Sequence, residues 1–501
     1  MAITTVIGAF FGDEGKGKQI AAFAEELSRN TESFFSKVAN KEIIGYGIRV
    51  NGGPNGGHAL VENGVKVSGH VVPSTILYPR ILSIIGAGCA INLAKLAKEI
   101  NDFREKGFFR GSLVVDGNAQ IIIEAYEKLD GLRNGRDSTG SGISDVFGHK
   151  GKRDGIRARD LLDQRRLAEK VNNLIPTLYA EMYEITRKKL GVELGDPRII
   201  EDENYLKFVR DYSIENIMNS FNEYQNLSQQ IISNEIADEL RDAVHLNKPI
   251  LSEGSQSYYL GIDSGLERGS SSVINPSGIF VTQGIPQMRQ RIVAVTKAFF
   301  SRVGNGYFVG EFGDRSKAVK KGPLLMSLGL SEDAPREEYL QMSIDMMRSD
   351  DPQKIGDGLR LFYGEFGETT KFPRGKSPFD LVAMRSLFKQ IARGSQNEIE
   401  LHINQMDGLE HFDRIPIITE YAAPDGKRYR TIPAMNDWRL KQLTPIVQYL
   451  PSWEKKLEGA YEQWPNAAKD FINFIEIESG FRVGGIGNGP EAKDIIKIPR
   501  R

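Results

Sequence analysis

The sequence predicts an α/β protein built around a single sheet-based domain with helical insertions. Short β-branched runs end at glycines and are followed by charged segments with apolar residues at helical spacing. The 501 residues are 40% hydrophobic and 26% charged, which is typical of a globular chain with a sizeable core. No repeat, low-complexity linker or charge block divides the chain. A separate helical lobe near 165–245 is the alternative organisation.

The elements follow in order along the chain. The run from Ile3 to Gly8 predicts a strand, and the stretch after it predicts a helix, because Ile20, Phe23, Ala24 and Leu27 share one helical face. Further strands are predicted in "RILSIIGAG", "GSLVVDG", "KPILSEG", "QRIVAVTKAFF", "ELHINQM" and "RIPIITEY". Amphipathic helices are predicted in "RRLAEKVNNLIPTLYAEMYEITRKKL" and "SNEIADELRDAVHL".

The bulk charge and the cysteine content exclude several classes of protein. A net charge of −1 gives no broad basic field for nucleic acid or an anionic membrane, so any anion site must be local. The single cysteine, Cys89, excludes an intrachain disulfide and lies in an apolar run. No signal peptide and no apolar stretch of about 20 residues is found. We therefore expect a cytoplasmic protein with no membrane partner.

A glycine-rich loop follows the first strand, in "GDEGKGK". Gly12, Gly15 and Gly17 permit unusual backbone angles and let amide groups approach an anion, and the next helix adds the partial positive charge of its N-terminus. Lys16 and Lys18 supply counter-charge. The segment matches neither the usual P-loop spacing nor G-x-G-x-x-G, so a plain tight turn is the alternative to a phosphate site.

This loop also carries an acidic pair, Asp13 and Glu14. A carboxylate beside a phosphate is repelled unless a cation bridges the two groups or the carboxylate transfers a proton. Asp13 is therefore a candidate Mg²⁺ ligand, general base or both. The alternative for Asp13 is an N-cap of the following helix.

A second glycine-rich loop, "RVNGGPNGGHALVENG", contains His58, one of only six histidines. Little apolar sequence surrounds His58, which favours a catalytic or ligand-binding role over a place in the core. The other histidines form no spaced metal pattern, so the sequence argues against a zinc site.

These two loops resemble the adenylosuccinate synthetase family, whose paired hallmarks are G-D-E-G-K-G-K and G-G-x-N-A-G-H-T. Five further stretches are similar to family motifs and occur in the family's order: "DSTGSGISDVFGHKGKRDGIR", "LSEGSQSYYLGID", "VTKAFFSRVGNGYF", "FGETTKFPRGKSPFDLVAMR" and "NQMDGLEHFDRIPI". The resemblance spans nearly the whole chain. It implies a large, mostly parallel sheet with helices on both sides and smaller subdomains around a ligand cleft.

The resemblance also implies a reaction. The family couples IMP, GTP and L-aspartate to give adenylosuccinate, GDP and phosphate, with Mg²⁺. Asp13 would take the proton from N1 of the purine, so that the 6-oxygen attacks the γ-phosphate of GTP. His58 would act as acid and charge stabiliser, and the aspartate amine would displace phosphate from the 6-phosphoryl intermediate. Asp13 and the Gly57 carbonyl would be the Mg²⁺ ligands.

The remaining site residues carry over position by position. The GTP set is Gly12, Gly15, Lys16, Gly17, Lys18, Gln405, Asp407 and Gly489. The purine nucleotide set is Asn55, Thr139, Arg153, Gln256, Ser271 and Val303, and Gln256 is also placed among the catalytic residues. Arg153 matches an arginine that crosses a homodimer interface, although a solvated basic loop is the alternative. The aspartate set is Thr370, Lys371 and Arg374.

The sequence departs from the family in the aspartate loop and in length. Lys371 replaces a family glycine, Phe372 replaces a substrate-binding arginine, and Gln405 replaces the lysine that stacks on guanine. A phenyl ring cannot replace a bidentate guanidinium. Inserts are expected near 30–47, 170–245 and 315–360. These departures motivate two alternatives: the same ligase chemistry on another purine nucleotide such as dGMP or with another amino donor, and a non-catalytic purine nucleotide-binding protein.

Overall fold

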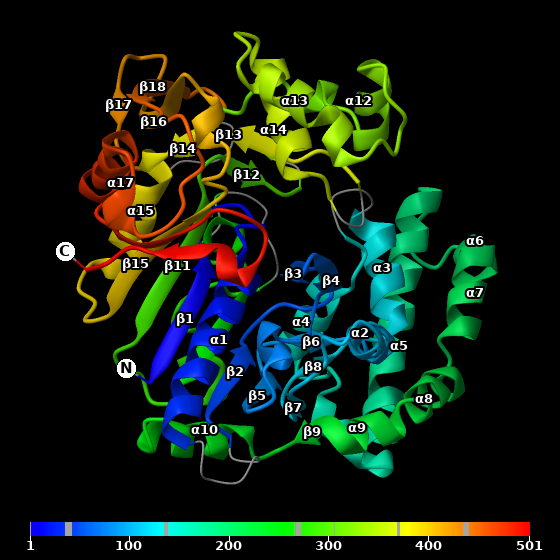
Figure 1. Cartoon of the computed structure of the whole chain (residues 1–501). Coiled ribbons are helices and arrows are strands. Elements are labelled where there is room, and N and C mark those ends of the chain that lie inside the picture. Colours follow the sequence, from blue (N-terminus) through cyan, green and yellow to red (C-terminus); the bar gives the residue numbers. More distant parts are fainter. Residues whose placement is uncertain are drawn as a thin grey trace.

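The computed structural model describes residues 2–35, 43–134, 139–264, 266, 272–304, 306–367, 371–433 and 440–500. Its centre is a ten-stranded sheet (Figure 1). The strands are β1 (Ile3–Gly8), β2 (Gly45–Arg49), β5 (Ile81–Ile85), β7 (Ser112–Asp116), β9 (Ile232–Ser233), β10 (Ile250–Ser257), β11 (Arg291–Lys297), β15 (Glu398–Asn404), β19 (Arg482–Gly487) and β20 (Ile495–Lys497).

The strand order is β20-β19-β15-β11-β1-β10-β2-β5-β7-β9, and every neighbouring pair is parallel except β19 with β20. In β1, Ile3, Val6 and Ile7 are all buried, as a strand covered on both faces requires. The predicted α/β class and mostly parallel sheet are confirmed.

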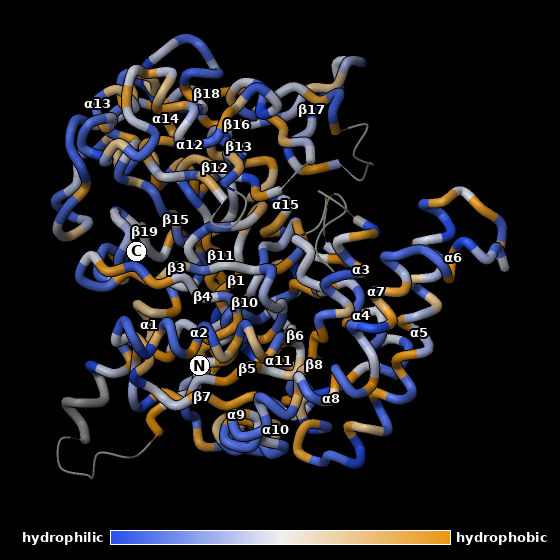
Figure 2. The backbone as a smooth tube through the Cα atoms, turned by 90° about the vertical axis from the view of Figure 1, so that its right-hand side faces the viewer, coloured by the Kyte–Doolittle hydropathy of each residue, from blue (hydrophilic) through white to orange (hydrophobic). Residues whose placement is uncertain are grey.

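Helices cover this sheet and extend beyond it (Figure 1). They are α1 (Lys16–Phe35), α2 (Leu93–Glu105), α3 (Glu124–Asn134), α4 (Ile143–Lys152), α5 (Gln164–Leu190), α6 (Arg198–Glu201), α7 (Glu203–Asp211), α8 (Ile214–Asn222), α9 (Gln225–Ile231), α10 (Ile236–His245), α11 (Gly278–Gln283), α12 (Lys321–Ser327), α13 (Arg336–Met347), α14 (Pro352–Tyr363), α15 (Leu381–Ala392) and α17 (Asn466–Ser479). Figure 2 shows apolar and polar residues alternating along the outer helices. Within the described ranges, no helix has both the length and the apolar character needed to cross a bilayer.

The longest helix, α5, shows why its sequence folds as it does. Asp163 caps its N-terminus by accepting from the amide of Arg166, and Gly191 ends it in the left-handed conformation at φ 66°. Its apolar face, which includes Leu167 and Leu178, packs into the same core as Val115 of β7. This part of the 165–245 segment therefore shares a core with the sheet.

Smaller sheets complete the fold. The strand β16 (Arg414–Ala422) pairs with β14 (Phe379–Asp380), β17 (Arg428–Tyr429) and β18 (Thr444–Pro451). The other pairs are β3 (His58–Glu62) with β4 (Val65–Gly69), β6 (Ala90–Ile91) with β8 (Gln120–Ile121), and β12 (Phe300–Arg302) with β13 (Gly375–Ser377). The run "RIPIITEY" is thus a strand, but it belongs to a second sheet. Helices α12–α14 gather at the top of the molecule (Figure 1), which agrees with the expected smaller subdomains.

The topology brings several sequence-distant polar residues together. Lys297 ends β11, Ser257 ends β10, Asn404 ends β15, and the glycine-rich loop follows β1. Because these strands are parallel neighbours, their carboxyl ends meet at one edge of the sheet. Ligands of open α/β sheets bind in the crevice at this edge. The candidate site is therefore built around the β1–α1 loop.

Candidate active site

The β1–α1 loop adopts a conformation that places Asp13 at its tip. Gly12, Asp13 and Gly15 all have positive φ, at 106°, 61° and 93°. A β-carbon on Gly15 would lie 2.6 Å from the Asn404 side-chain nitrogen, so a larger residue does not fit there. A non-glycine residue in the left-handed region is uncommon and is found more often at functional sites. Asp13 precedes α1 and is not its N-cap in the structure, because helix α1 begins at Lys16.

Glu14 points into the protein and organises the loop. Its carboxylate accepts from the amides of Gly12 at 2.9 Å and Phe10 at 3.2 Å, from Lys16 Nζ at 3.0 Å and from Ser257 Oγ at 2.5 Å. Burial alone would raise the pKa of Glu14, but Lys16 and these hydrogen bonds lower it below its ordinary value. The two adjacent acids therefore differ: Glu14 holds the loop, and Asp13 remains for ligand chemistry.

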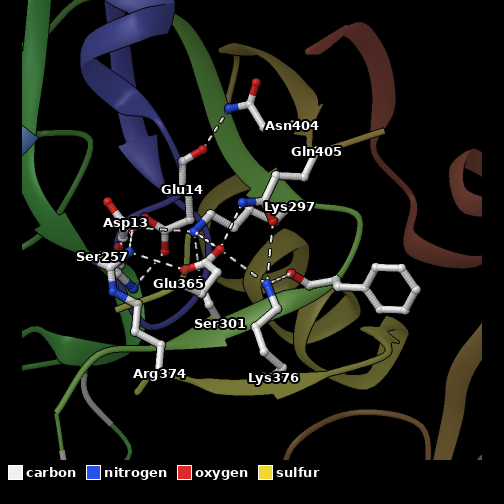
Figure 3. Close-up of polar contacts among 12 residues, drawn as sticks. Asp13, Glu14, Ser257, Lys297, Ser301, Glu365, Arg374, Lys376, Asn404 and Gln405 are labelled. Atoms are coloured by element: carbon white, nitrogen blue, oxygen red, sulfur yellow. Dashed lines mark hydrogen bonds and ion pairs between the residues drawn. The ribbon is translucent and has the colours of Figure 1, made fainter. Parts of the chain in front are cut away.

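The Asp13 carboxylate has a 36% exposed side chain and contacts two cations (Figure 3). Its Oδ2 atom accepts from Arg374 Nη1 and lies 3.4 Å from Lys297 Nζ. Lys297 is itself fixed by Ser301 Oγ at 3.0 Å. The carboxylate is thus oriented from one side by two basic groups while part of it stays open.

A buried glutamate stands behind these cations. Glu365 Oε1 accepts from Lys297 at 2.7 Å, Lys376 at 3.2 Å and Gln405 Nε2 at 2.8 Å, and Oε2 accepts from Arg374 at 3.1 Å (Figure 3). Burial would raise the pKa of Glu365, but Lys297, Lys376 and Arg374 hold it well below its usual range. Burial also lowers the pKa of Lys376 to about 8, against the opposing effect of Glu365.

Three of these residues were not identified as site residues from the sequence: Glu365, Lys297 and Lys376. Lys297 lies inside a stretch that carries the family resemblance, which was the available signal. Glu365 stands in "YGEFG", a context with no local pattern for chemistry. Its role becomes visible only because α14, β11 and β13 converge.

His58 begins β3 and packs against the phosphate loop. A β-carbon on Gly17 would lie 3.3 Å from His58 Cδ2, so His58 and the N-terminal turn of α1 are neighbours. Arg49 Nη1 lies 2.9 Å from Nδ1, and Arg49 is held by Ser255 Oγ at 2.6 Å and Glu253 at 3.3 Å. Burial and the Arg49 cation hold the pKa of His58 well below its usual range.

The tautomer of His58 follows from this contact. An arginine can only donate, so Nδ1 must accept, and the neutral ring carries its proton on Nε2. Nε2 is buried and has no hydrogen-bond partner among the described residues. Nε2 faces the β3–β4 hairpin, where a β-carbon on Gly69 would lie 2.8 Å from it, so this N–H can reach a developing anion only after the ring turns.

The residues expected to bind the purine nucleotide are brought together in part. Gln256 is 9% exposed and donates from Nε2 to Asn55 at 3.3 Å, while its Oε1 is buried with no partner among the described residues. Val303, 41% exposed, lies against Gly12, where a β-carbon would approach it to 2.9 Å. Thr139 is exposed and donates to Ser141 Oγ at 3.0 Å.

The other residues expected in the nucleotide and aspartate sets are either exposed at the surface or not described by the structure. Arg153 is exposed at the C-terminal end of α4, with a left-handed φ of 69°. Ser271 and Thr370 lie outside the described residues. Lys371 is exposed, with φ 57°. Phe372 is 59% exposed, and Lys320 Nζ lies 5.4 Å from its ring centre.

The residues expected around guanine form a second group. Lys18 Nζ donates to the carbonyl of Gly489 at 2.9 Å, which ties α1 to the loop after β19. Burial lowers the pKa of Lys18 to about 8, although the nearby Asp407 carboxylate opposes this. Burial raises the pKa of Asp407. Gln405, at φ 58°, has its carbonyl fixed by the Tyr363 hydroxyl at 2.9 Å.

The loop is compatible with Mg²⁺ without a preformed cage. Among the described residues, no group of three or more acidic, histidine or cysteine side chains could hold a metal on its own. Mg²⁺ is usually bound by one or two carboxylates together with substrate phosphates and water. The partly exposed Asp13 carboxylate next to a phosphate-type loop fits this arrangement. Gly57 is exposed, and the space beside its α-carbon faces His70.

Comparison with known proteins adds independent information. The family model described as adenylosuccinate synthetase matches residues 5–496. Curated proteins named adenylosuccinate synthetase from Acidothermus cellulolyticus and Helicobacter pylori strain P12 are 27% identical over 508 residues and 30% identical over 501 residues. The first pair covers 99% of both chains and the second covers 98% of both.

Two solved structures share the fold. A fully ligated adenylosuccinate synthetase from Plasmodium falciparum superposes with a TM-score of 0.74 at 22% identity, with 100% of both chains covered. A succinoaminodeoxyadenylate synthetase from cyanophage S-2L, bound to dGMP and dATP, gives a TM-score of 0.50 at 15% identity, over 99% of this chain and 95% of that chain.

Proposed function

Because this chain belongs to the adenylosuccinate synthetase family, we propose that it joins L-aspartate to the 6-position of IMP at the expense of GTP. The products are adenylosuccinate, GDP and phosphate. The enzyme class is a carbon–nitrogen ligase. The observation that carries the proposal is Asp13, which a strained loop presents at the start of α1 while Arg374 and Lys297 orient its carboxylate.

The proposed chemistry assigns one proton transfer and one stabilising contact to the chain. Asp13 takes the N1 proton of IMP, so that the 6-oxygen attacks the γ-phosphorus and GDP leaves. The stabilising contact with the transferring phosphoryl group is assigned to His58 by the family resemblance, and it requires the ring to turn from its position between Arg49 and Gly69. The aspartate amine then attacks C6, and phosphate leaves. Mg²⁺, bound through Asp13 and with the Gly57 carbonyl as the second expected ligand, would neutralise charge on the phosphates.

The binding roles follow the observed groups. Lys16 and the amides of Gly15 and Gly17 hold the GTP phosphates, and Lys18 fixes the Gly489 loop while Asp407 reads the guanine edge. Gln256 and Asn55, already hydrogen-bonded to each other, bind IMP. Arg374, whose guanidinium contacts Asp13 in the structure, is assigned to the carboxylate of the L-aspartate substrate.

Two assembly and location assignments complete the proposal. Arg153 is exposed at the end of a helix, as a residue must be to reach the nucleotide of a second copy, and we assign a homodimer on this basis. We place the reaction in the cytoplasm, which the single free and buried thiol, Cys89, also fits.

A second candidate is favoured by Phe372. Where the family has a guanidinium, this chain presents an exposed ring with Lys320 beside it, so the carboxylate site is altered. The same chemistry with another amino donor, or on another purine nucleotide such as dGMP, is therefore the alternative. A non-catalytic nucleotide-binding protein would have no need for the strained Asp13 turn.

The test is phosphate release by the purified protein with Mg²⁺, GTP and IMP, with and without L-aspartate, followed by mass analysis of the nucleotide. Aspartate-dependent release and a product of adenylosuccinate mass are expected. Turnover that requires dGMP or a different amine would establish the alternative. No turnover with any of these substrates would overturn the assignment of a ligase.

A further inference from the structure

Glu365 lies where the proposed GTP and L-aspartate subsites meet the Asp13 carboxylate. It is 1% exposed and lies two residues after α14 ends at Tyr363, so it can act on a substrate only through other side chains. Its partners differ in function: Arg374 belongs to the aspartate loop, Gln405 to the guanine loop, and Lys297 reaches Asp13. The close-up in Figure 3 shows these side chains converging on one carboxylate.

The contacts divide between the two carboxylate oxygens. Oε2 accepts from Arg374 at 3.1 Å, and Oε1 accepts from Lys297, Lys376 and Gln405 at 2.7, 3.2 and 2.8 Å. Lys376 also lies 3.4 Å from Gln405 Oε1 and donates to the carbonyl of Phe299 at 3.1 Å. Hydrogen bonds between charged groups in a buried setting are strong and directional. A displacement of Glu365 must therefore move groups in more than one subsite.

From this arrangement we propose that Glu365 is a positioning residue that aligns the GTP and L-aspartate subsites with Asp13. It holds Gln405 on one side and Arg374 on the other, while Lys297 connects it to the catalytic carboxylate. Lys376 contacts Gln405 directly as well as Glu365, so its removal should affect the Gln405 side most. The inference rests on the proposed function, because it takes the roles of Arg374, Gln405 and Asp13 from it.

The alternative is that this buried charge cluster has a purely structural role and only stabilises the fold. Glu400 provides a matched comparison. It is 5% exposed, and it accepts from Arg291 at 2.9 Å, Arg482 at 2.7 Å and His402 at 3.2 Å. None of these partners is among the proposed site residues. Both glutamates are thus buried carboxylates with several basic partners, but only Glu365 connects to the site.

The substitution Glu365→Gln tests the proposal. The new amide nitrogen can only donate, and it would face Arg374 or the lysines, which also only donate, so at least one of these hydrogen bonds is lost. The expected result is a rise of about tenfold or more in KM for both GTP and L-aspartate, with a lower kcat. The KM for IMP is expected to change less than about threefold, because no described contact joins Glu365 to Gln256 or Asn55. Glu400→Gln is expected to change none of the three KM values.

A loss of folded protein lowers kcat alone, so the pattern of KM values separates positioning from stability. A fall in kcat with unchanged KM values, or an equal rise in all three, would overturn the inference. If Glu365→Gln does not fold, Lys376→Met gives the second test. It is expected to raise KM for GTP and to spare L-aspartate, and the reverse result would overturn the inference.

Failure of the proposed function would be seen separately, as wild-type protein without aspartate-dependent turnover. The variants are then compared by calorimetric titration with GDP and Mg²⁺. Glu365→Gln is expected to bind GDP about tenfold more weakly than wild type, and Glu400→Gln is expected to bind it equally well. Equal binding by Glu365→Gln would overturn the inference. A wild-type protein that binds no GDP would overturn both proposals.

Discussion

Replacing Glu14 by glutamine should loosen the phosphate loop and weaken nucleotide binding. The change keeps the shape of the side chain but removes a charge that is 2% exposed and that accepts from Gly12, Phe10, Lys16 and Ser257. A glutamine can offer only one oxygen to these donors, and its nitrogen faces another donor. Lys16, itself 8% exposed, is left without its carboxylate partner.

The magnitude follows from the burial of the pair. Removing one partner of a buried ion pair costs about 3–5 kcal/mol. The unfolding entropy of about 2.1 cal/mol/K per residue amounts to about 1 kcal/mol/K over 501 residues. The expected fall in Tm is therefore about 3–5 °C if the chain unfolds cooperatively. The Kd for GDP should rise at least tenfold, because Lys16 and the Gly12–Gly15 turn are both displaced.

The assay is thermal unfolding together with calorimetric GDP titration, with Glu400→Gln as control. The control should lose stability by a similar amount and keep its GDP affinity. The pKa of Glu14 lies below its ordinary value of 4.5, so its stabilisation is complete above that pH and is lost as the pH falls through the folded-state pKa. The Tm difference should shrink in acid. A variant with wild-type Tm and GDP affinity at pH 7 would refute the role given to Glu14.

Three further outcomes are expected. Arg374→Met should lower kcat/KM for L-aspartate about 100-fold, because the proposed substrate contact is lost together with the two contacts that place Arg374 beside Asp13 and Glu365. Arg374→Lys should recover only part of this activity, and steady-state kinetics measures both variants. Burial lowers the pKa of Lys18 to about 8, so its charge is lost above that pH, and the Kd for GDP should rise about fourfold between pH 7 and 8.5. The Lys18→Met variant should show a smaller rise, and GDP titration at several pH values measures both. Phe372→Arg should lower KM for L-aspartate about tenfold without changing Tm, and an unchanged KM would argue for a different amino donor.

The sequence was sufficient for those parts of the fold and site that depend on local pattern. The first strand was predicted with its observed bounds, Ile3–Gly8, and the glycine-rich loop was predicted between it and a helix. The family resemblance assigned Gln256 and Asn55 to one purine nucleotide set, and the structure shows their side chains in hydrogen-bond contact. Whether the chain has the expected inserts stays a prediction, although α5–α10 and α12–α14 lie in two of those ranges.

What the sequence could not supply is the direction in which charged side chains point. Asp13 and Glu14 are adjacent in the sequence, but their side chains point in different directions. Asp13 contacts Arg374 in the partly open site, whereas Glu14 accepts from Ser257 in the interior. The difference arises from the positive φ at Asp13 and from Ser257, which is 243 positions away. Glu365 likewise receives donors from β11, β13 and the loop after β15. Such clusters depend on topology, and no local periodicity encodes them.

The loop that contains Phe372 still has two cationic side chains beside it, the ammonium of Lys320 and the guanidinium of Arg374. Loss of the family arginine at Phe372 removes a planar, bidentate donor, yet Lys320 brings an ammonium group to within 5.4 Å of that ring. Lys320 comes from the segment expected as an insert, so the added segment and the changed loop meet at one place. Arg374 keeps a guanidinium nearby, held by Asp13 and Glu365. Under the proposed function, a donor with two carboxylates would meet one fork-shaped cation and one point charge, which favours a carboxylate-bearing amine but lowers the geometric selectivity for L-aspartate.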